Sequence, residues 1–174
     1  MTTYERPSDW EEPVFIPDVD ASFERLMVPF DGSHSAEQAL GYAVVLARVT
    51  GAEIVVVVAY DAPVTVRRRG ALVVEDTRAG MRSEAEGLAA EAVAQLQTKG
   101  CQARGIVIEG DPVEGILQTA DAEEADIILM GRRGLTAELR AVQRIVHAGL
   151  AYVTHGSIAE KVTRHATVPV LLVG

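Results

Sequence analysis

The chain has 174 residues, of which 48% are hydrophobic and 24% charged, and its formal net charge at pH 7 is −9. This length fits one domain with its own core, and the composition is typical of a globular protein. A negative charge of this size argues against general affinity for nucleic acid or anionic membranes. The single cysteine excludes an intrachain disulfide. Because no apolar run approaches a membrane span of about 20 residues, we expect a cytoplasmic protein with neither nucleic acid nor membrane as partner.

Residues 1–22 predict an N-terminal arm that precedes the domain. The arm is acidic and is interrupted by three prolines, at positions 7, 13 and 17. It also carries Trp10, Phe15 and Ile16, which are apolar enough to dock on another surface, so we expect it to be partly ordered. Residues 23–174 then form a single domain.

The patterning from Arg25 onward alternates between strands and helices. Continuous apolar runs predict strands at residues 25–30, 54–59, 103–109, 126–130 and 168–173. Helical spacing predicts helices over residues 35–51, 88–100 and 111–120, whereas residues 61–80 show no sustained period and are interpreted as a loop. Asp111-Pro112 is a typical helix start, while Asp31, Ser33 and Ser35 all remain candidates for capping the first helix. The alternation predicts a three-layer α/β/α sandwich with a parallel sheet.

Two glycines follow the fourth predicted strand and straddle two arginines. Gly131 and Gly134 would let backbone N–H groups approach an anion, and Gly156-Ser157 opens another helical segment whose first N–H groups would add donors. Ligands of parallel sheets bind at the carboxyl ends of strands, where the strand order reverses. If the first and fourth strands are neighbours, Asp31 and these glycines line one crevice.

The chain resembles the universal stress protein family in stretches that occur in the family's order. These are LMVPFDGS (26–33), GDP (110–112), ADIILMGRRG (125–134), GSIAEKV (156–162) and VPVLLV (168–173). The resemblance implies a Rossmann-like fold with a five-stranded parallel sheet of order 3-2-1-4-5. It also implies a homodimer through Val168–Val173 and, in one branch of the family, binding of ATP, with Mg²⁺ on the phosphates.

The resemblance carries over to individual positions. Pro29 and Asp31 would border the adenosine, and Val58 or Ala59 would offer backbone groups to adenine. The phosphates would be held by Gly131, Gly134, Gly156, Ser157 and Ile158. Met130 and Arg133 belong to the same turn and are added to the candidate site, although Arg133 could equally lie in a solvated loop.

The spacing between the two glycine motifs departs from the ATP-binding branch. That branch has nine residues between them, whereas residues 135–155 separate them here. Within this insertion an apolar stripe predicts an amphipathic helix; it consists of Leu135, Leu139, Val142, Ile145, Val146 and Leu150. The helix could cover the cleft as a lid, pack on a partner subunit, or fill the nucleotide site itself.

The sequence leaves several functional hypotheses open. The leading one is a stress-response protein that binds ATP and acts by binding rather than turnover. The alternative is a dimeric interaction module that does not bind nucleotide, because its inserted helix fills or remodels the cleft. No catalytic acid–base pair, nucleophile turn, Walker motif or metal-ligand spacing is found, so no catalytic or metal-binding residue is assigned. Slow ATP hydrolysis or autophosphorylation on a serine is a third hypothesis.

Overall fold

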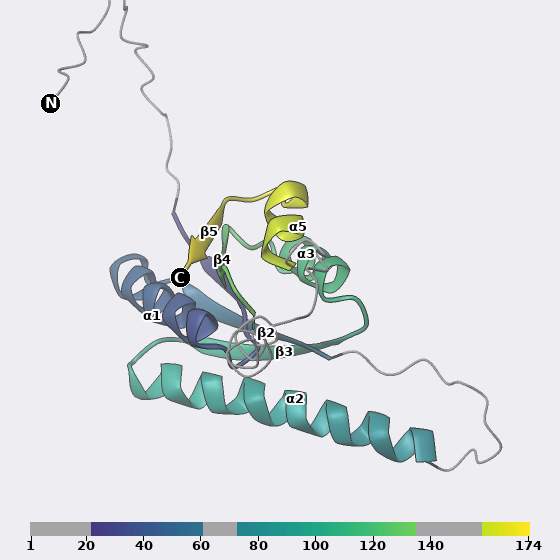
Figure 1. Cartoon of the computed structure of the whole chain (residues 1–174). Helices are drawn as coiled ribbons and strands as arrows, with labels where there is room; N and C mark the ends of the chain where they lie inside the picture. The colour runs from purple at the N-terminus through teal and green to yellow at the C-terminus, as the bar shows by residue number, and fades with distance from the viewer. Residues whose placement is uncertain (1–21, 61–72, 135–157) are drawn as a thin grey trace, which may run out of the picture.

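The computed structural model describes residues 22–60, 73–134 and 158–174. Its centre is a five-stranded sheet in which all neighbouring strands are parallel (Figure 1). The strands are β1 (Arg25–Pro29), β2 (Glu53–Tyr60), β3 (Ala103–Glu109), β4 (Ile127–Gly131) and β5 (Val170–Val173). Their order is β3-β2-β1-β4-β5, which confirms the predicted fold class and strand order.

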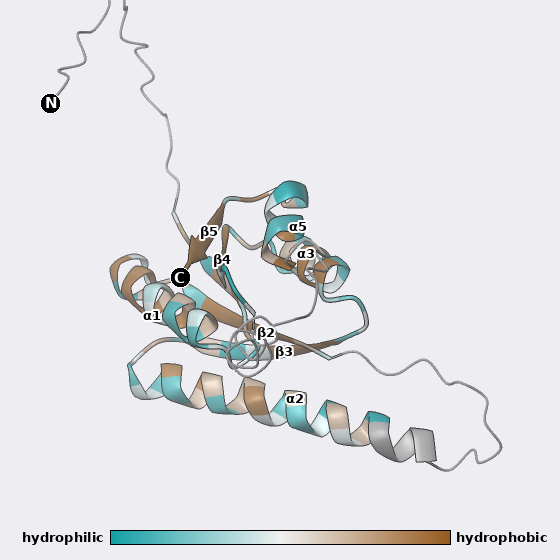
Figure 2. Ribbon diagram, in the orientation of Figure 1, coloured by the Kyte–Doolittle hydropathy of each residue, from teal (hydrophilic) through white to brown (hydrophobic). Residues whose placement is uncertain are grey.

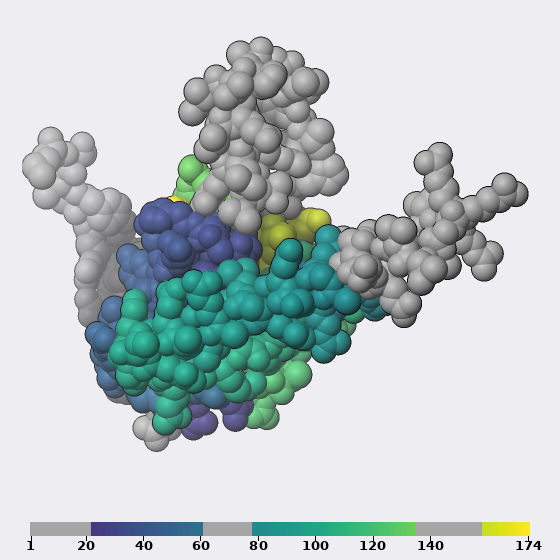
Figure 3. All heavy atoms as spheres, turned by 90° about the horizontal axis from the view of Figure 1, so that it is seen from below, coloured from purple at the N-terminus to yellow at the C-terminus, as the bar shows by residue number. Residues whose placement is uncertain are grey.

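Helices cover both faces of the sheet. On one face lie α1 (His34–Thr50) and α2 (Val73–Thr98), and on the other lie α3 (Pro112–Ala122) and α5 (Ile158–His165) (Figure 1). In the view of Figure 3 the sheet is hidden behind α2, with α1 beside it. The layers are therefore helix, sheet and helix, as expected for a sheet whose strands are apolar on both faces.

The core is divided by the sheet into two parts. Successive side chains of a strand point to opposite faces, so Ile54 and Val56 pack toward α1 and α2, whereas Val55 and Val57 pack toward α3 and α5. These four side chains are buried, and the strands form the brown centre of the ribbon in Figure 2. This double burial explains why residues 54–58 read as an uninterrupted apolar run.

Two helix starts are fixed by side-chain caps. The Asp111 carboxylate accepts hydrogen bonds from the backbone N–H groups of Val113 and Glu114, at 2.9 and 3.0 Å, with Pro112 in the first helical turn. This confirms the predicted start of α3. Of the three candidates for capping α1, Ser33 is the N-cap, and its hydroxyl accepts from the N–H of Ala36 at 3.2 Å.

The interpretation of residues 61–80 as a loop is wrong for its last part, because α2 begins at Val73. The side chains from Arg78 to Glu84 are all exposed. A helical period in apolar residues arises only where a helix buries one face, so this turn of α2 leaves no such pattern. Residues 61–72 lie outside the described residues, as do the predicted arm and the inserted helix. Within the described ranges, no helix is long and apolar enough to cross a membrane.

An ion-pair network connects the amino-terminal ends of β2 and β3 with the C-terminal end of α3. Arg104 donates to the carboxylates of Glu53, at 3.2 Å, and of Glu123. The hydrogen bond from Arg104 lowers the pKa of Glu123, and burial partly opposes this shift. A carboxyl group whose pKa is lower in the folded state stabilises the fold above its unfolded pKa, and that contribution is lost as the pH falls.

We expect Arg104→Met to lower the melting temperature most near neutral pH. The difference from the parent chain should shrink as the pH falls below the usual Glu pKa of 4.5, because protonated Glu123 no longer depends on Arg104. The control is Arg164→Met, which removes an exposed pair with Glu160 on α5 and should change the melting temperature little. A difference for Arg104→Met that is constant from pH 7 to pH 3 would contradict this account.

Candidate functional site

The carboxyl ends of β1 and β4 meet where the strand order reverses. β1 pairs with β2 on one side and with β4 on the other, in the register Leu26↔Ile127. The turn that follows β1 contains Asp31, and the turn that follows β4 contains Gly131–Gly134. The adjacency that the sequence left open is therefore present, and the two turns lie at the position where parallel sheets bind ligands.

Gly131 lies against the first turn of α1. A Cβ atom added to it would be 2.5 Å from Ser35 Oγ and 2.8 Å from the backbone nitrogen of Ala36. Real Cβ atoms essentially never approach backbone so closely, so only glycine fits without moving the helix. The packing of α1 on the end of β4 is therefore enough to require Gly131, with or without a ligand.

Gly134 has a different neighbour, the carboxylate of Asp31. A Cβ atom at Gly134 would lie 2.9 Å from Asp31 Oδ2. The other carboxylate oxygen, Oδ1, accepts the N–H of Ser33 at 3.0 Å. Gly32, which lies between Asp31 and Ser33, has a φ of +75°, a left-handed conformation that suits this tight turn. One carboxylate oxygen is thus held by its own turn, while the other faces the glycine turn.

Two serines connect the turns through the carbonyl of Arg133. The Ser35 hydroxyl donates to that carbonyl oxygen, and the Ser33 hydroxyl approaches it at 3.4 Å. Both serines are buried. Sequence reasoning treated them only as candidate helix caps and missed this contact, because the partner lies about a hundred residues away in the chain. The pair holds the backbone of Arg133, whose side chain is exposed.

The end of β2 distinguishes the two candidate backbone positions. The Val57 carbonyl accepts the N–H of Phe30, after β1, and the Tyr60 carbonyl accepts the N–H of Gly110, after β3. Main-chain groups of successive residues in a strand point alternately to its two neighbours. Val58 therefore directs its backbone groups toward β3. Ala59 directs its backbone groups to the opposite side, toward the space beyond the end of β1 at Pro29.

The remaining candidate residues are placed around these turns. Pro29 and Met130 are buried at the ends of β1 and β4. Ile158 is exposed as the first residue of α5. Gly156 and Ser157 lie outside the described residues, so the structure does not place them relative to Gly131 and Gly134.

A charged cluster lies beside this region at the ends of β2 and β3. The Tyr60 hydroxyl donates to Glu109 at 2.9 Å, and Arg78 of α2 forms an ion pair with the same carboxylate. Burial, followed by the hydrogen bond to Glu109, raises the pKa of Tyr60. The hydrogen bond from Tyr60, and then Arg78, lower the pKa of Glu109. Glu109 therefore stays ionised and Tyr60 protonated near neutral pH, so this pair is no acid–base couple.

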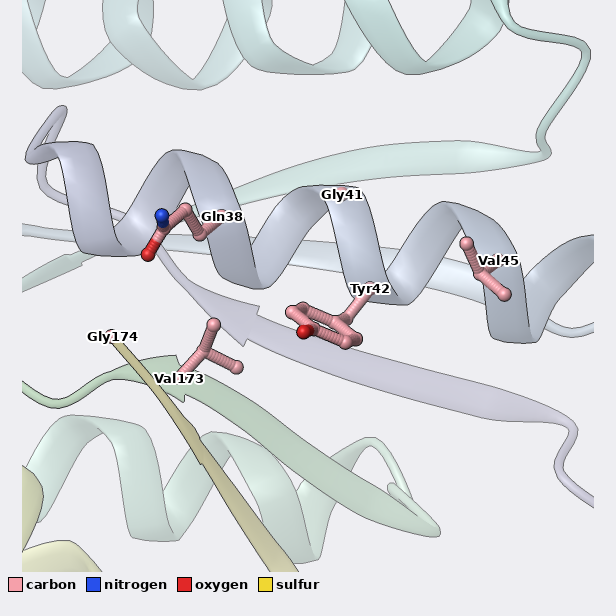
Figure 4. A pocket seen from close by; sticks show the side chains of 6 residues that line it. All are labelled: Gln38, Gly41, Tyr42, Val45, Val173 and Gly174. Carbon is pink, nitrogen blue, oxygen red and sulfur yellow. The ribbon is translucent and has the colours of Figure 1, made fainter.

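Other surface features lie away from the two turns. Among the described residues, no group of three or more His, Cys, Asp or Glu side chains could hold a metal ion. One shallow pocket lies between α1 and β5 (Figure 4) and another between α3 and α5, and neither is lined by Asp31 or Gly131–Gly134.

The two glycines of the β4 turn should respond differently to substitution. Gly131→Ala should destabilise the fold by about 1–3 kcal/mol, the usual cost of overpacking a tight contact, because its Cβ would meet backbone. Gly134→Ala should be tolerated, since its φ is not left-handed and its Cβ meets only a side-chain oxygen that can rotate away. Urea unfolding measures both variants, and equal stabilities would contradict this distinction.

Comparison with known proteins supports the family resemblance. The model of the "Universal stress protein family" matches residues 22–174. A universal stress protein of Thermus aquaticus is 35% identical over 151 residues, which cover 87% of this chain and 98% of the relative.

Solved structures share the fold. Universal stress protein UspA from Lactobacillus plantarum has a TM-score of 0.69 at 19% identity, covering 89% of this chain and all of that one. The universal stress protein from Archaeoglobus fulgidus, solved in complex with dAMP, has a TM-score of 0.58 at 21% identity and covers 88% of this chain and all of that one. With a family model that spans the whole domain and a relative this similar, the chain belongs to the universal stress protein family.

Proposed function

We propose that this universal stress protein binds an adenine nucleotide, ATP with Mg²⁺, at the turns after β1 and β4, and acts in the cytoplasm by binding rather than turnover. The observation that carries the proposal is the meeting of Asp31 with Gly134 at the point where the strand order reverses. The dAMP complex of the Archaeoglobus fulgidus relative, which has the same fold, supports an adenine nucleotide as the ligand.

The adenosine would lie over the ends of β1 and β2. Asp31 Oδ2 lies beside Gly134, and a carboxylate oxygen can accept more than one hydrogen bond, so Asp31 could accept one from a ribose hydroxyl. Ala59 directs its N–H and C=O toward the space beyond β1 and can pair with the edge of adenine. Val58 directs its backbone toward β3, and its side chain is buried in the core with α1 and α2, so Ala59 is the stronger of the two candidates. Pro29 and Met130 are buried at the strand ends and would support the site from beneath.

The phosphates would be held by backbone N–H groups rather than by a cluster of side chains. Gly131 and Gly134 keep the β4 turn free of Cβ atoms, and Gly156, Ser157 and Ile158 would add the N-terminus of α5. Arg133 can pair with phosphate oxygens from an anchored backbone. Mg²⁺ would be held mainly through the phosphates, as is usual for this ion, which fits the lack of a three-ligand group in the described part of the chain.

Calorimetric titration with Mg-ATP tests the proposal. Asp31→Ala should weaken binding by roughly tenfold or more, since a hydrogen bond to a charged group contributes about 1.5–3 kcal/mol. The matched control is Glu37→Ala, which removes an exposed carboxylate from the first turn of α1 and should leave the affinity unchanged.

Absence of heat and of any thermal shift with millimolar Mg-ATP, dAMP or cAMP would refute nucleotide binding. That outcome would favour the alternative, an interaction module whose residues 135–155 fill or remodel the cleft. These residues lie outside the described part, so the long spacing between the glycine motifs is the observation behind the alternative. Phosphate release above a protein-free blank, lost in Asp31→Ala, would instead indicate slow hydrolysis.

We also propose that the protein is a homodimer through β5. Among residues 22–60, 73–134 and 158–174, this strand pairs only with β4 and forms one edge of the sheet, and its Leu171 and Leu172 are 37% and 38% exposed. An unpaired apolar edge strand is prone to pair with another strand. Antiparallel pairing of two copies of β5 about a twofold axis would cover both edges in a closed assembly.

Light scattering should give twice the chain mass of 18.6 kDa for the parent protein. The double variant Leu171→Asp/Leu172→Asp should be monomeric, because like charges would face each other across the paired strands. Met81→Asp, which adds one negative charge at an exposed position of α2 away from β5, should remain dimeric. A parent mass near that of one chain would rule out the dimer.

A further inference from the structure

The outer surface of α1 carries a line of exposed apolar side chains. Tyr42, Val45 and Val49 are 56%, 59% and 82% exposed, and their spacing of three and four residues places them on one side of the helix. The same line borders the shallow pocket between α1 and β5, whose other wall includes Val173 (Figure 4). We call Tyr42, Val45 and Val49 the α1 stripe.

The α1 stripe is not needed for the core of the domain. α1 already buries a separate set of residues against the sheet; it includes Ala36, Ala39, Leu40, Ala43, Val44 and Ala47. A surface helix normally carries polar residues opposite such a face. Three large apolar side chains in a row beside a groove therefore indicate a surface that another segment covers.

The chain enters the domain at one end of this stripe. Phe23 packs against the part of the core that α1 shares, and the carbonyl of Glu24 accepts the N–H of Glu53 at 2.8 Å. Glu53 is four residues after Val49 in the sequence. The polypeptide that precedes Phe23 therefore starts at the end of the sheet where α1 ends and β2 begins.

That preceding polypeptide has the length and composition to cover the stripe. It contains Trp10, Val14, Phe15 and Ile16, and it lies outside the family model, which begins at residue 22. The stripe is about 10 Å long from Val49 to Tyr42 at 1.5 Å per residue. The seven residues from Ile16 to Phe23 span at most about 25 Å when extended, which is enough to bring Phe15 beside Val45.

We propose that the segment Trp10–Ile16, which lies outside the described residues, docks on the α1 stripe of its own chain. Its apolar side chains would cover Tyr42, Val45 and Val49 and would close the flank of the groove beside β5. Acidic residues and prolines surround these apolar side chains in the sequence. The docked arm is a feature of this chain added to the family's domain, and it does not depend on nucleotide.

Trp10 is the only tryptophan of the chain and therefore reports on the arm without a label. In the full-length protein, acrylamide should quench its fluorescence less than in the urea-unfolded chain. Val45→Asp should raise the quenching constant to the unfolded value and shift the emission to the red, while circular dichroism stays unchanged. Met81→Asp, of equal charge on exposed α2, should leave Trp10 shielded.

A cross-link tests the same contact independently of fluorescence. With Phe15→Cys and Val45→Cys in one chain, mild oxidation should form a disulfide within the monomer, since the native Cys101 is buried. Phe15→Cys with Met81→Cys should not cross-link. The proposal is overturned if Trp10 is quenched equally in the folded and unfolded parent. It is also overturned if the disulfide joins two chains, or if Val45→Asp halves the mass by light scattering, because a second copy would then cover the stripe.

Discussion

The close approach of β4 to the first turn of α1 is the contact on which the proposed site depends. Gly131 brings the strand end within reach of Ser35, and the two buried serines then bind the Arg133 carbonyl. A side chain at Gly131 would push α1 away from the sheet. The turn after β1 would move with it, because Ser33 both caps α1 and is bound by Asp31. The packing of α1 and the geometry of the proposed site are thus set by the same few atoms.

This coupling changes how the glycine motif is interpreted. Gly131 is required by the fold itself, whereas a Cβ atom at Gly134 would meet only the carboxylate of Asp31. A motif of two glycines therefore combines a structural requirement with a requirement of the crevice. The acidic net charge of the protein is not an obstacle here, since backbone N–H groups and a local arginine can bind an anion independently of the overall field.

The two proposed contact surfaces, the edge of β5 for the dimer and the α1 stripe for the arm, lie side by side. The edge of β5 and the α1 stripe flank the groove that Val173 and Tyr42 line. Pairing of two β5 strands extends the sheet, whereas the arm would cover the helix above it, so both contacts can exist in one assembly. The proposed dimer would use a surface within the family's domain, while the arm lies outside the matched residues 22–174.

The residue pattern is sufficient to predict the sheet and the burial of its strands. Runs such as residues 54–58 are apolar at every position because both faces are covered, and Asp111-Pro112 marks a helix start through local hydrogen bonds. It misplaced the start of α2, because the exposed turn around Arg78 buries no face and so has no periodic signal.

Which distant residues meet depends on how the strands and helices pack in three dimensions. The contact of Ser35 with Arg133, the difference between Gly131 and Gly134, and the direction of the Ala59 backbone all depend on β1 lying between β2 and β4. A pattern along the chain records the burial of each residue. The pattern does not identify a contact with a residue a hundred positions away, because such contacts depend on which strands pair.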